Sequence, residues 1–354
     1  MVYSGGMSKR VFVGLSGGVD SAVSAALLKS QGYEVVGVFI KIWQPEFIEC
    51  TWQKDRLDAM RVAATLGIPF REINLSEEYK KEVVEDMLAN YARGVTPNPD
   101  VLCNVHIKFG AFLDWALAEG ADIIATGHYA RVRKEGSTYQ LLRGKDSNKD
   151  QSYFLCGLRQ EALAHVMFPV GEYTKPEVRV LAKKYGLPNA KRPDSQGLCF
   201  VGDVNVYEFL TRFLPTEEGN VLDANGRIIG RHKGAILYTI GQRHGFEIGG
   251  GENVPHYVIG LDVKENEIVV SRNKADAARK ELKIKEIHWI TRTKLPLSCT
   301  AHVRYRDMVR PCTLRAEKDF FVAKFEEPTI ASPGQSLVLY EGDICLGGGI
   351  ISNT

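Results

Sequence analysis

The segment that decides the fold is LSGGVDS, residues 15–21, because it joins a strand-like run to a helix-like run. Residues 11–15 are short and apolar, as in a buried strand of a parallel sheet, and residues 22–28 favour a helix. The glycines allow several backbone N–H groups to converge on one point, and the helix N-terminus adds partial positive charge. This arrangement predicts an oxyanion site, although a plain strand-to-helix turn with a Ser or Asp cap has a similar signature. The segment lacks the lysine of a Walker loop and the spacing of a GxGxxG loop.

The first two-thirds of the chain alternates strand-like and helix-like segments. Further expected strands cover residues 34–40, 70–75 and 122–126, and expected helices cover residues 54–66, 83–91 and 106–118. This alternation is typical of an open α/β domain with a parallel sheet and crossover helices. Such sheets bind ligands at the carboxyl ends of their strands. Ile40 ends one expected strand and Gly127 follows another, so both are candidates for nucleotide contacts.

After about residue 215 the helical periodicity disappears. Short β-branched runs at residues 227–229, 257–261 and 267–270 predict a small β-rich domain. From residue 283 the strand pattern strengthens, and a small β-barrel is predicted from residues 300–306, 312–315, 320–325 and 336–340. We therefore predict three domains, at residues 1–215, 216–282 and 283–354.

The composition limits the class of protein. The 354 residues exceed the ~250 that one hydrophobic core usually supports, and 44% hydrophobic with 25% charged residues is typical of soluble chains. No apolar run approaches the ~18 residues of a membrane span, and the first ten residues resemble neither a secretory signal nor a transit peptide. We therefore expect a cytoplasmic protein without a membrane partner. The net charge of +2 excludes a strongly basic RNA-binding tail but allows local basic faces.

Two of the seven cysteines differ from the others in their surroundings. An odd number of cysteines without a secretory signal indicates free thiols in a reducing compartment. Cys103 follows a Pro- and Asn-containing stretch that predicts a rigid loop, and it begins an expected helix, where a thiol has a lowered pKa. Cys199 lies in a Gly-containing loop, where functional residues are frequent. The remaining cysteines are predicted to be small buried hydrophobes: Cys50, Cys156, Cys299, Cys312 and Cys345. A structural zinc site is not expected, because the chain has no C-x2-C pair.

An ordered series of motifs carries a family resemblance. By itself, SGGVDS resembles the loop of the PP-loop ATP hydrolases. The full series resembles the bacterial-type tRNA-specific 2-thiouridylases over essentially the whole chain: SGGVDS at 16–21, TPNPDVLCN at 96–104, KF at 108–109, ATGHY at 125–129, KDQSYFL at 149–155, DSQGLCF at 194–200, GRHKGAILYTIGQRHG at 230–245 and SPGQSLVLYEGDICLGGGII at 332–351. Residues 1–6 depart from the family pattern and are interpreted as a non-native or alternative start.

The resemblance implies a fold and a reaction. The fold would be a PP-loop α/β domain, a small β-rich central domain and a C-terminal β-barrel that contacts tRNA. ATP would adenylate O2 of the wobble uridine, U34, because an amide-like oxygen does not leave as oxide, and a sulfur nucleophile would then displace AMP. Mg²⁺ would lie with the ATP near Asp20. The implied ATP-binding residues are Gly14, Leu15, Ser16, Gly17, Gly18, Val19, Asp20, Ser21, Ile40 and Gly127.

The resemblance also assigns roles to the thiols and to the RNA-binding residues. Cys199 would carry a persulfide received from a cysteine desulfurase or a sulfur-relay protein. Cys103 would release its sulfur or form a disulfide with Cys199, and Asp100 would act as general base. The partner would be the anticodon loop of tRNAs for Lys, Glu and Gln. The target base and the tRNA would be contacted by Asn98, Pro99, Asp100, Lys149, Asp150, Gln151, Arg304 and Tyr305.

Local basic clusters agree with this partner, although each alone could be a solvated surface. They are Lys183-Lys184, Lys191-Arg192, residues 231–233, residues 242–244 and residues 304–306.

Three alternatives remain open at this point. A PP-loop ligase for two small metabolites would explain the loop but would need neither cysteine. An RNA-binding scaffold with a degenerate nucleotide site would not release AMP. An iron–sulfur cluster on Cys103, Cys199 and Asp100 is a further variant of the first reading, although most protein-held clusters use more than two thiolates. His128 is interpreted as a capping or packing histidine rather than a ligand contact.

Overall fold

The computed structural model describes residues 8–47, 52–194, 206–249 and 254–352. The chain divides into two compact units. Unit 1 contains residues 1–83, 100–203 and 343–345, and unit 2 contains residues 84–99, 204–342 and 346–354. The parallel sheet, the small β-rich region and the C-terminal barrel are all present, so the predicted fold class is confirmed.

Unit 1 is built on a five-stranded sheet with the order β3-β2-β1-β4-β7. All its pairings are parallel, and the strands are β1 (Arg10–Gly14), β2 (Glu34–Lys41), β3 (Phe70–Asn74), β4 (Ile123–Ala125) and β7 (Val166–Met167). The chain leaves β1 to pair with β2 on one side and later with β4 on the other. The segment that follows β1 therefore lies where the strand order reverses, which is where open α/β sheets bind ligands.

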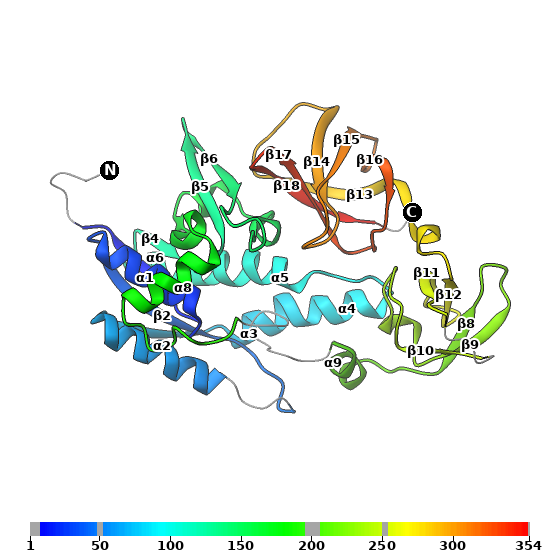
Figure 1. Cartoon of the computed structure of the whole chain (residues 1–354), viewed down its shortest axis with the longest axis horizontal. Helices are drawn as coiled ribbons and strands as arrows, with labels where there is room; N and C mark the ends of the chain where they lie inside the picture. Colours follow the sequence, from blue (N-terminus) through cyan, green and yellow to red (C-terminus); the bar gives the residue numbers. More distant parts are fainter. Residues whose placement is uncertain (1–7, 48–51, 195–205, 250–253, 353–354) are drawn as a thin grey trace. The chain divides into compact units, whose positions relative to one another are not determined.

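Helices cover both faces of this sheet (Figure 1). Val11 and Val13 of β1 point to one face, where they share a hydrophobic core with α1 (Val19–Ser30), α2 (Trp52–Leu66) and α8 (Lys175–Lys184). Phe12 points to the other face, because side chains alternate along a strand, and its ring lies 5.8 Å from that of Trp115 in α6 (Phe112–Ala118).

Unit 1 also contains elements that the sequence patterns did not predict. The hairpin β5 (Ala130–Glu135) and β6 (Thr138–Arg143) follows β4, and Ile344 and Cys345 pair with Leu142 and Leu141 of β6. Among the described residues, the other helical segments of the N-terminal two-thirds are α3 (Ser76–Tyr79), Lys80–Glu85, α4 (Asp86–Ala92), α5 (Pro99–Leu102), Cys103–Ala111, Ser152–Leu155, α7 (Gln160–Leu163) and Pro169–Glu172. Of these, α4 belongs to unit 2 and lies within the helix predicted over residues 83–91.

The helix that carries Cys103 begins earlier than its sequence suggested. The loop predicted before Cys103 already turns into helix at Pro99, where the missing N–H of proline costs nothing and its fixed φ suits a first helical position. Cys103 therefore lies one turn inside a continuous helical stretch, Pro99–Ala118, and not at its N-terminus. By length and composition this stretch alone among the described residues could cross a membrane, but half of it is buried in the protein, as in core helices.

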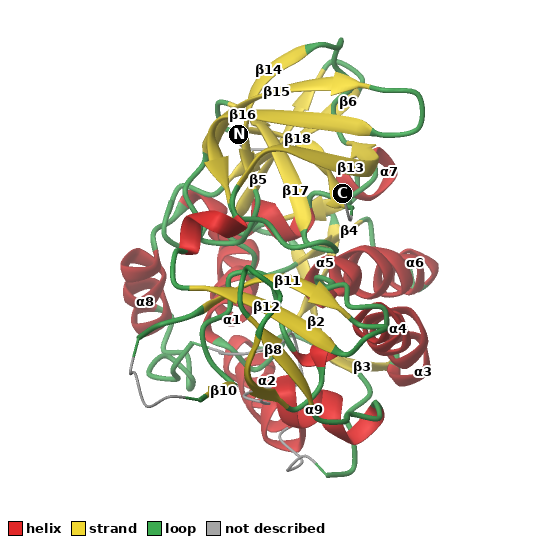
Figure 2. Cartoon of the chain, turned by 90° about the vertical axis from the view of Figure 1, so that its right-hand side faces the viewer, coloured by secondary structure: helices red, strands yellow, loops and turns green. Residues whose placement is uncertain are grey.

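Unit 2 contains two β structures (Figure 2). In the first, the strands run in the order β10-β9-β8-β12-β11. They are β8 (Gly219–Leu222), β9 (Ile228–His232), β10 (Phe246–Ile248), β11 (Tyr257–Asp262) and β12 (Glu267–Ser271). The helical segments between residues 206 and 278 are α9 (Val206–Phe213), Ala235–Leu237 and Lys274–Ala277.

The second β structure is the barrel. Its strands pair in the order β13-β16-β15-β14-β17-β18, and β13 pairs again with β18, which closes the ring. They are β13 (Arg279–Trp289), β14 (Leu297–His302), β15 (Arg310–Ala316), β16 (Phe321–Thr329), β17 (Ser336–Glu341) and β18 (Ile344–Ile351). The strand predicted over residues 300–306 ends at His302. Arg304 and Tyr305 lie in the turn to β15, in which Arg306 has a φ of +63°.

Candidate nucleotide site

The loop after β1 is held by its own serines. The Ser21 hydroxyl accepts a hydrogen bond from the Ser16 N–H at 3.2 Å and donates one to the Gly18 carbonyl at 3.2 Å. Gly17 has a φ of +76°, and a Cβ there would lie 2.6 Å from the Asp55 carbonyl oxygen, so only glycine fits. Gly18 is the N-cap of α1 and offers no side-chain acceptor to the first turn. The N–H groups of that turn can therefore serve an anion.

Gly127 follows β4 and packs directly against this loop. A Cβ at Gly127 would lie 2.6 Å from the Ser21 nitrogen and 2.8 Å from the Asp20 carbonyl carbon. The missing side chain thus accommodates the loop itself, which is a physical reason for glycine that does not depend on a nucleotide. On the other side of the loop, Ile40 at the end of β2 is buried and borders Gly14.

Asp20, in the first turn of α1, is held by two groups from distant segments. The Tyr129 hydroxyl donates a hydrogen bond to its Oδ1 at 2.8 Å, and the Lys175 ammonium lies 2.7 Å and 2.9 Å from its two oxygens. Burial, and then the neighbouring Asp20 carboxylate, raise the pKa of Tyr129, so its hydroxyl stays protonated as the donor. Lys175 lies in the first turn of α8, where the helix dipole disfavours a cation, so the carboxylate offsets an unfavourable position.

Asp194 forms ion pairs with three cations next to Asp20. Its carboxylate lies 2.6 Å from Lys149, 2.9 Å from Lys175 and 2.6 Å from Arg179. Burial alone would raise the pKa of Asp194, but hydrogen bonds from Lys149 and Lys175 outweigh it and hold this pKa well below the ordinary range. A third carboxylate, that of Asp146, accepts a hydrogen bond from the Lys175 N–H at 2.8 Å. The three cations are therefore held by carboxylates beside the loop, where an anionic ligand could also meet them.

The back of the loop is supported by a segment near residue 190. Asn189 donates hydrogen bonds to the Gly17 carbonyl at 2.7 Å and the Gly18 carbonyl at 3.0 Å. The Arg192 guanidinium lies 2.8 Å from Asp58 and also bonds Asp55, which ties α2 to the loop. These contacts fix the carbonyls of Gly17 and Gly18, and thereby the backbone of the loop.

Sequence reasoning missed several members of this network: Tyr129, Lys175, Arg179, Asn189 and Asp194. One local signal was available. Thr174 and Glu177 form a capping box, in which the Glu177 carboxylate accepts from the Thr174 N–H at 2.6 Å, and this pattern predicts that a helix starts at Lys175. Nothing local indicates that this helix end lies beside residue 20.

The side chains of the motif KDQ, residues 149–151, all make contacts with other residues of unit 1. Asp150 accepts hydrogen bonds from the Gly144 and Ser152 N–H groups at 3.0 Å and 3.1 Å, and Gln151 accepts one from the Tyr129 N–H at 2.9 Å. Lys149 bonds Asp194 as described above. These residues therefore organise the loop next to Tyr129, and their expected contacts with tRNA stay a prediction.

Cys103 and Asp100 lie in unit 1, on the same helical stretch. Cys103 is fully buried, and the amide of the neighbouring Asn104 donates to the Phe154 carbonyl at 3.1 Å. Asp100 lies in the first turn and is half-buried. Cys199 falls outside the described residues, as does Cys50, so the expected pairing of Cys103 with Cys199 stays a prediction.

His128 has the surroundings of a packing residue. Its ring is buried between Phe109 and Phe168, at centroid distances of 5.7 Å and 5.9 Å, and its Nδ1 lies 2.7 Å from the Thr126 hydroxyl. Burial, with a smaller contribution from the charge of Lys108, lowers the pKa of His128 well below its ordinary value. A neutral, enclosed imidazole agrees with the interpretation that it is not a ligand contact.

The other expected RNA contacts lie in unit 2. Asn98 and Pro99 belong to its segment 84–99. Arg304 donates to the Ile240 carbonyl at 2.6 Å and to the Ser332 hydroxyl at 2.9 Å. Its guanidinium therefore connects the turn after β14 to two other segments of unit 2. Tyr305 is half-buried, with the Arg306 guanidinium 5.3 Å from its ring centroid.

Of the cysteines predicted to be buried hydrophobes, Cys156, Cys312 and Cys345 are buried, whereas Cys299 is only half-buried. Within the described part of the chain, no group of three or more His, Cys, Asp or Glu side chains is placed to hold a metal ion. Asp20 belongs to the loop itself, and its carboxylate oxygens suit Mg²⁺, which binds one or two carboxylates together with phosphate oxygens.

Comparison with known proteins gives consistent matches along the chain. Residues 9–203 match a tRNA methyl transferase HUP domain, residues 207–272 a tRNA methyl transferase PRC-barrel domain, and residues 279–351 an aminomethyltransferase beta-barrel domain. The tRNA-specific 2-thiouridylase MnmA of Streptococcus mutans is 47% identical over 97% of this chain and 95% of its own. That of Nitrosomonas eutropha is 47% identical over 98% and 99%. Among solved structures, the U34-tRNA thiolase NcsA from Methanococcus maripaludis is 19% identical with a TM-score of 0.36, over 58% of this chain and 67% of its own.

Proposed function

Because the chain belongs to the family of tRNA-specific 2-thiouridylases, we propose that it is a tRNA-uridine 2-sulfurtransferase that uses ATP to exchange O2 of the wobble uridine for sulfur. The observation that carries this proposal is the loop of residues 14–21. It has an N-cap without a side chain, and Asp20, Asp194 and their three cations lie beside it. A backbone nest with lysine and arginine side chains beside it is suited to a polyphosphate.

The first step is adenylation. O2 of the uracil attacks the α-phosphorus of ATP, the bond to the β-phosphate breaks, and pyrophosphate remains on the loop. The Lys175 ammonium, which is paired with Asp20, can neutralise the negative charge that develops on the departing phosphates. Asp20 would hold Mg²⁺ when it is bound, and the ion would neutralise phosphate charge.

The second step is sulfur transfer. The terminal sulfur of a persulfide on Cys199 attacks C2 and AMP leaves. Cys103 then attacks the inner sulfur, the carbon-bound sulfur stays on the base, and a Cys103–Cys199 disulfide remains to be reduced. In this scheme Asp100 acts as the general base. Asp194 precedes Cys199 by five residues, a span of at most ~18 Å of chain, and Asp194 is anchored beside the loop.

The proposal specifies its partners. The substrate is the anticodon loop of tRNA, with the acceptors for Lys, Glu and Gln as the expected set, and the splayed uridine would enter the site. The sulfur donor is a cysteine desulfurase or a sulfur-relay protein. We place the reaction in the cytoplasm, where such donors and reduced thiols occur.

Mass spectrometry of tRNA nucleosides tests this proposal. Unmodified tRNA is incubated with ATP, Mg²⁺ and a persulfide donor, and wild type is expected to produce 2-thiouridine together with AMP. Cys199→Ser should lose the thiolated nucleoside while still binding ATP, and Cys345→Ser, which changes a buried barrel cysteine, should retain it. A metabolite ligase would keep full turnover in Cys199→Ser, and a scaffold would release no AMP.

A further inference from the structure

Two cysteines of the barrel face each other across neighbouring strands. In the antiparallel pair of β14 and β15, Cys299 and Cys312 occupy directly opposite positions. Their sulfur atoms are 3.6 Å apart. A disulfide needs a Sγ–Sγ distance of about 2.05 Å, so the sulfurs must approach by only ~1.5 Å. Directly opposed residues of antiparallel strands have their Cβ atoms close enough for such a rotation of the side chains.

We propose that Cys299 and Cys312 form an oxidation site that reacts with low-molecular-weight disulfides and closes a reversible disulfide across the barrel strands. This site lies in unit 2, and the inference does not rest on the proposed function, which uses Cys103 and Cys199. It also differs from the prediction that both cysteines serve only as small hydrophobes.

The two thiols differ in a way that orders the reaction. Cys299 is half-buried, whereas Cys312 is buried with 4% of its surface exposed. The hydrogen bond between the sulfurs lowers the pKa of Cys299 and, together with burial, raises that of Cys312. Cys299 is therefore the accessible thiol with more thiolate character, and Cys312 is the resolving thiol.

The reaction is balanced by two thiol–disulfide exchanges. The Cys299 thiolate attacks one sulfur of the small disulfide, whose S–S bond breaks and releases one small thiol. Cys312 then loses its proton and attacks the Cys299 sulfur of the mixed disulfide, which releases the second small thiol. The pair gives up two electrons and two protons, and one small disulfide becomes two thiols.

The position of the pair gives the cross-link a structural effect. The disulfide would enclose residues 300–311, which include the turn that presents Tyr305 and Arg306. Closing this loop removes conformational freedom from the unfolded chain, so the oxidised protein should unfold at a higher temperature than the reduced protein.

Peptide mapping at controlled redox poise tests the inference. The full chain carries Cys199→Ser, so that the disulfide of the sulfur-transfer scheme cannot form. It is equilibrated with mixtures of oxidised and reduced glutathione, alkylated, and digested without reductant. We expect a Cys299–Cys312 linked peptide that is lost on adding dithiothreitol, and a melting temperature several degrees higher for the oxidised form.

Control variants separate this disulfide from general oxidation. Cys299→Ser and Cys312→Ala should each lose the linked peptide and the shift in melting temperature. Cys156→Ser should keep both, because burial raises the pKa of the Cys156 thiol to about 12 and makes it unreactive. The inference is wrong if Cys299 stops at a stable mixed disulfide with glutathione, or if both thiols stay reduced in well-folded protein.

Discussion

At Gly127 the absence of one methyl group sets how closely β4 approaches the first turn of α1. The loop backbone occupies the space that a Cβ would need, at 2.6 Å from the Ser21 nitrogen. Backbone atoms cannot rotate away as a flexible side chain would, so a larger residue must displace the loop. The glycine is therefore a geometric requirement of the site.

Gly127→Ala tests this requirement. We expect a loss of stability of about 1–3 kcal/mol, as is typical of overpacking, together with weaker ATP binding, because Asp20 and Ser21 must shift. Thermal unfolding and calorimetric titration with ATP would measure the two effects. Gly260→Ala is the matched control, since its new Cβ would meet the side chain of Val269 at an ordinary 3.5 Å. Unchanged ATP affinity in Gly127→Ala would contradict the expectation.

His128 predicts a pH dependence of stability. Its pKa in the folded state lies well below 6.5 because the ring is buried, whereas in the unfolded chain it titrates near 6.5. As pH falls below ~6.5 the unfolded chain takes up a proton that the folded chain does not, so the free energy of unfolding decreases, by at most ~1.4 kcal/mol per pH unit from this residue.

The comparison of His128→Phe with wild type at pH 7.5 and 5.5 isolates this contribution. The variant keeps an aromatic ring between Phe109 and Phe168 but cannot be protonated, so its stability should fall less on acidification. Denaturant titrations at both pH values would measure the two stabilities. Parallel pH curves for wild type and His128→Phe would rule out a neutral buried imidazole.

At the scale of elements, the N-termini of α8 and α1 each contribute one charged side chain to the candidate site. The capping box of Thr174 and Glu177 fixes the start of α8, and this start carries the Lys175 ammonium to 2.7 Å from Asp20. Two helix ends, from segments far apart in the chain, thereby share one ion pair.

Lys175→Met should weaken pyrophosphate and ATP binding by ten-fold or more, since a charge-assisted contact to phosphate contributes about 1.5–3 kcal/mol. AMP binding should change less, because AMP lacks the departing phosphates. Lys175→Arg should recover part of the loss, and Lys184→Met, at the exposed far end of α8, should show none. Equal loss of AMP and pyrophosphate binding would indicate general damage to the fold instead.

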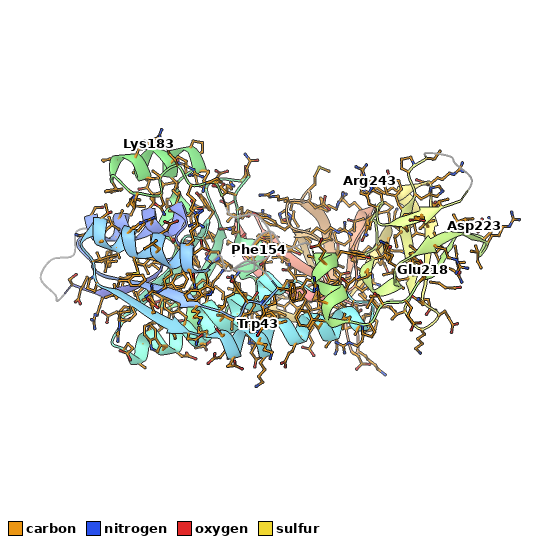
Figure 3. The ribbon with its side chains drawn as sticks, turned by 90° about the horizontal axis from the view of Figure 1, so that it is seen from below. Trp43, Phe154, Lys183, Glu218, Asp223 and Arg243 are labelled. Atoms are coloured by element: carbon orange, nitrogen blue, oxygen red, sulfur yellow. The ribbon has the colours of Figure 1, made fainter. Side chains whose placement is uncertain are left out.

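At the scale of the whole molecule, the balanced net charge hides local basic surfaces. Lys183 and Lys184 end α8, and Figure 3 shows Lys183 on the outer side of that helix. If such residues meet phosphates, binding releases counterions, and affinity must fall with salt concentration.

We therefore expect the logarithm of tRNA affinity to fall linearly with the logarithm of salt concentration, with a slope of magnitude at least ~3. Changing both Lys183 and Lys184 to Gln should reduce the magnitude of the slope by up to ~2 and weaken the binding of all tRNAs to the same degree. Lys54→Gln, at an exposed lysine of α2 outside the basic clusters, is the control. Filter binding at several salt concentrations would measure the slopes, and a slope near zero would exclude phosphate-dominated binding.

Local patterns determined much of this protein. The apolar run before SGGVDS, the alternation that follows it and the β-branched runs after residue 215 were sufficient for the parallel sheet, the β-rich region and the barrel, because hydrophobic periodicity and turn residues act over short distances. The loop and Gly127 could be chosen as candidates for the same reason. The helix start at Pro99 and the end of β14 at His302 were missed, because an element boundary depends on its neighbours in space.

Only the tertiary structure placed Lys175, Asn189 and Asp194 around residue 20, and Cys299 opposite Cys312. Each of these contacts joins residues that no local rule connects, because their distance is set by the packing of α8 on α1 and by strand register in the barrel. A sequence states which side chains are present and which segments are helical or extended. Which charges neutralise one another, and which thiols can meet, follows only when those segments pack.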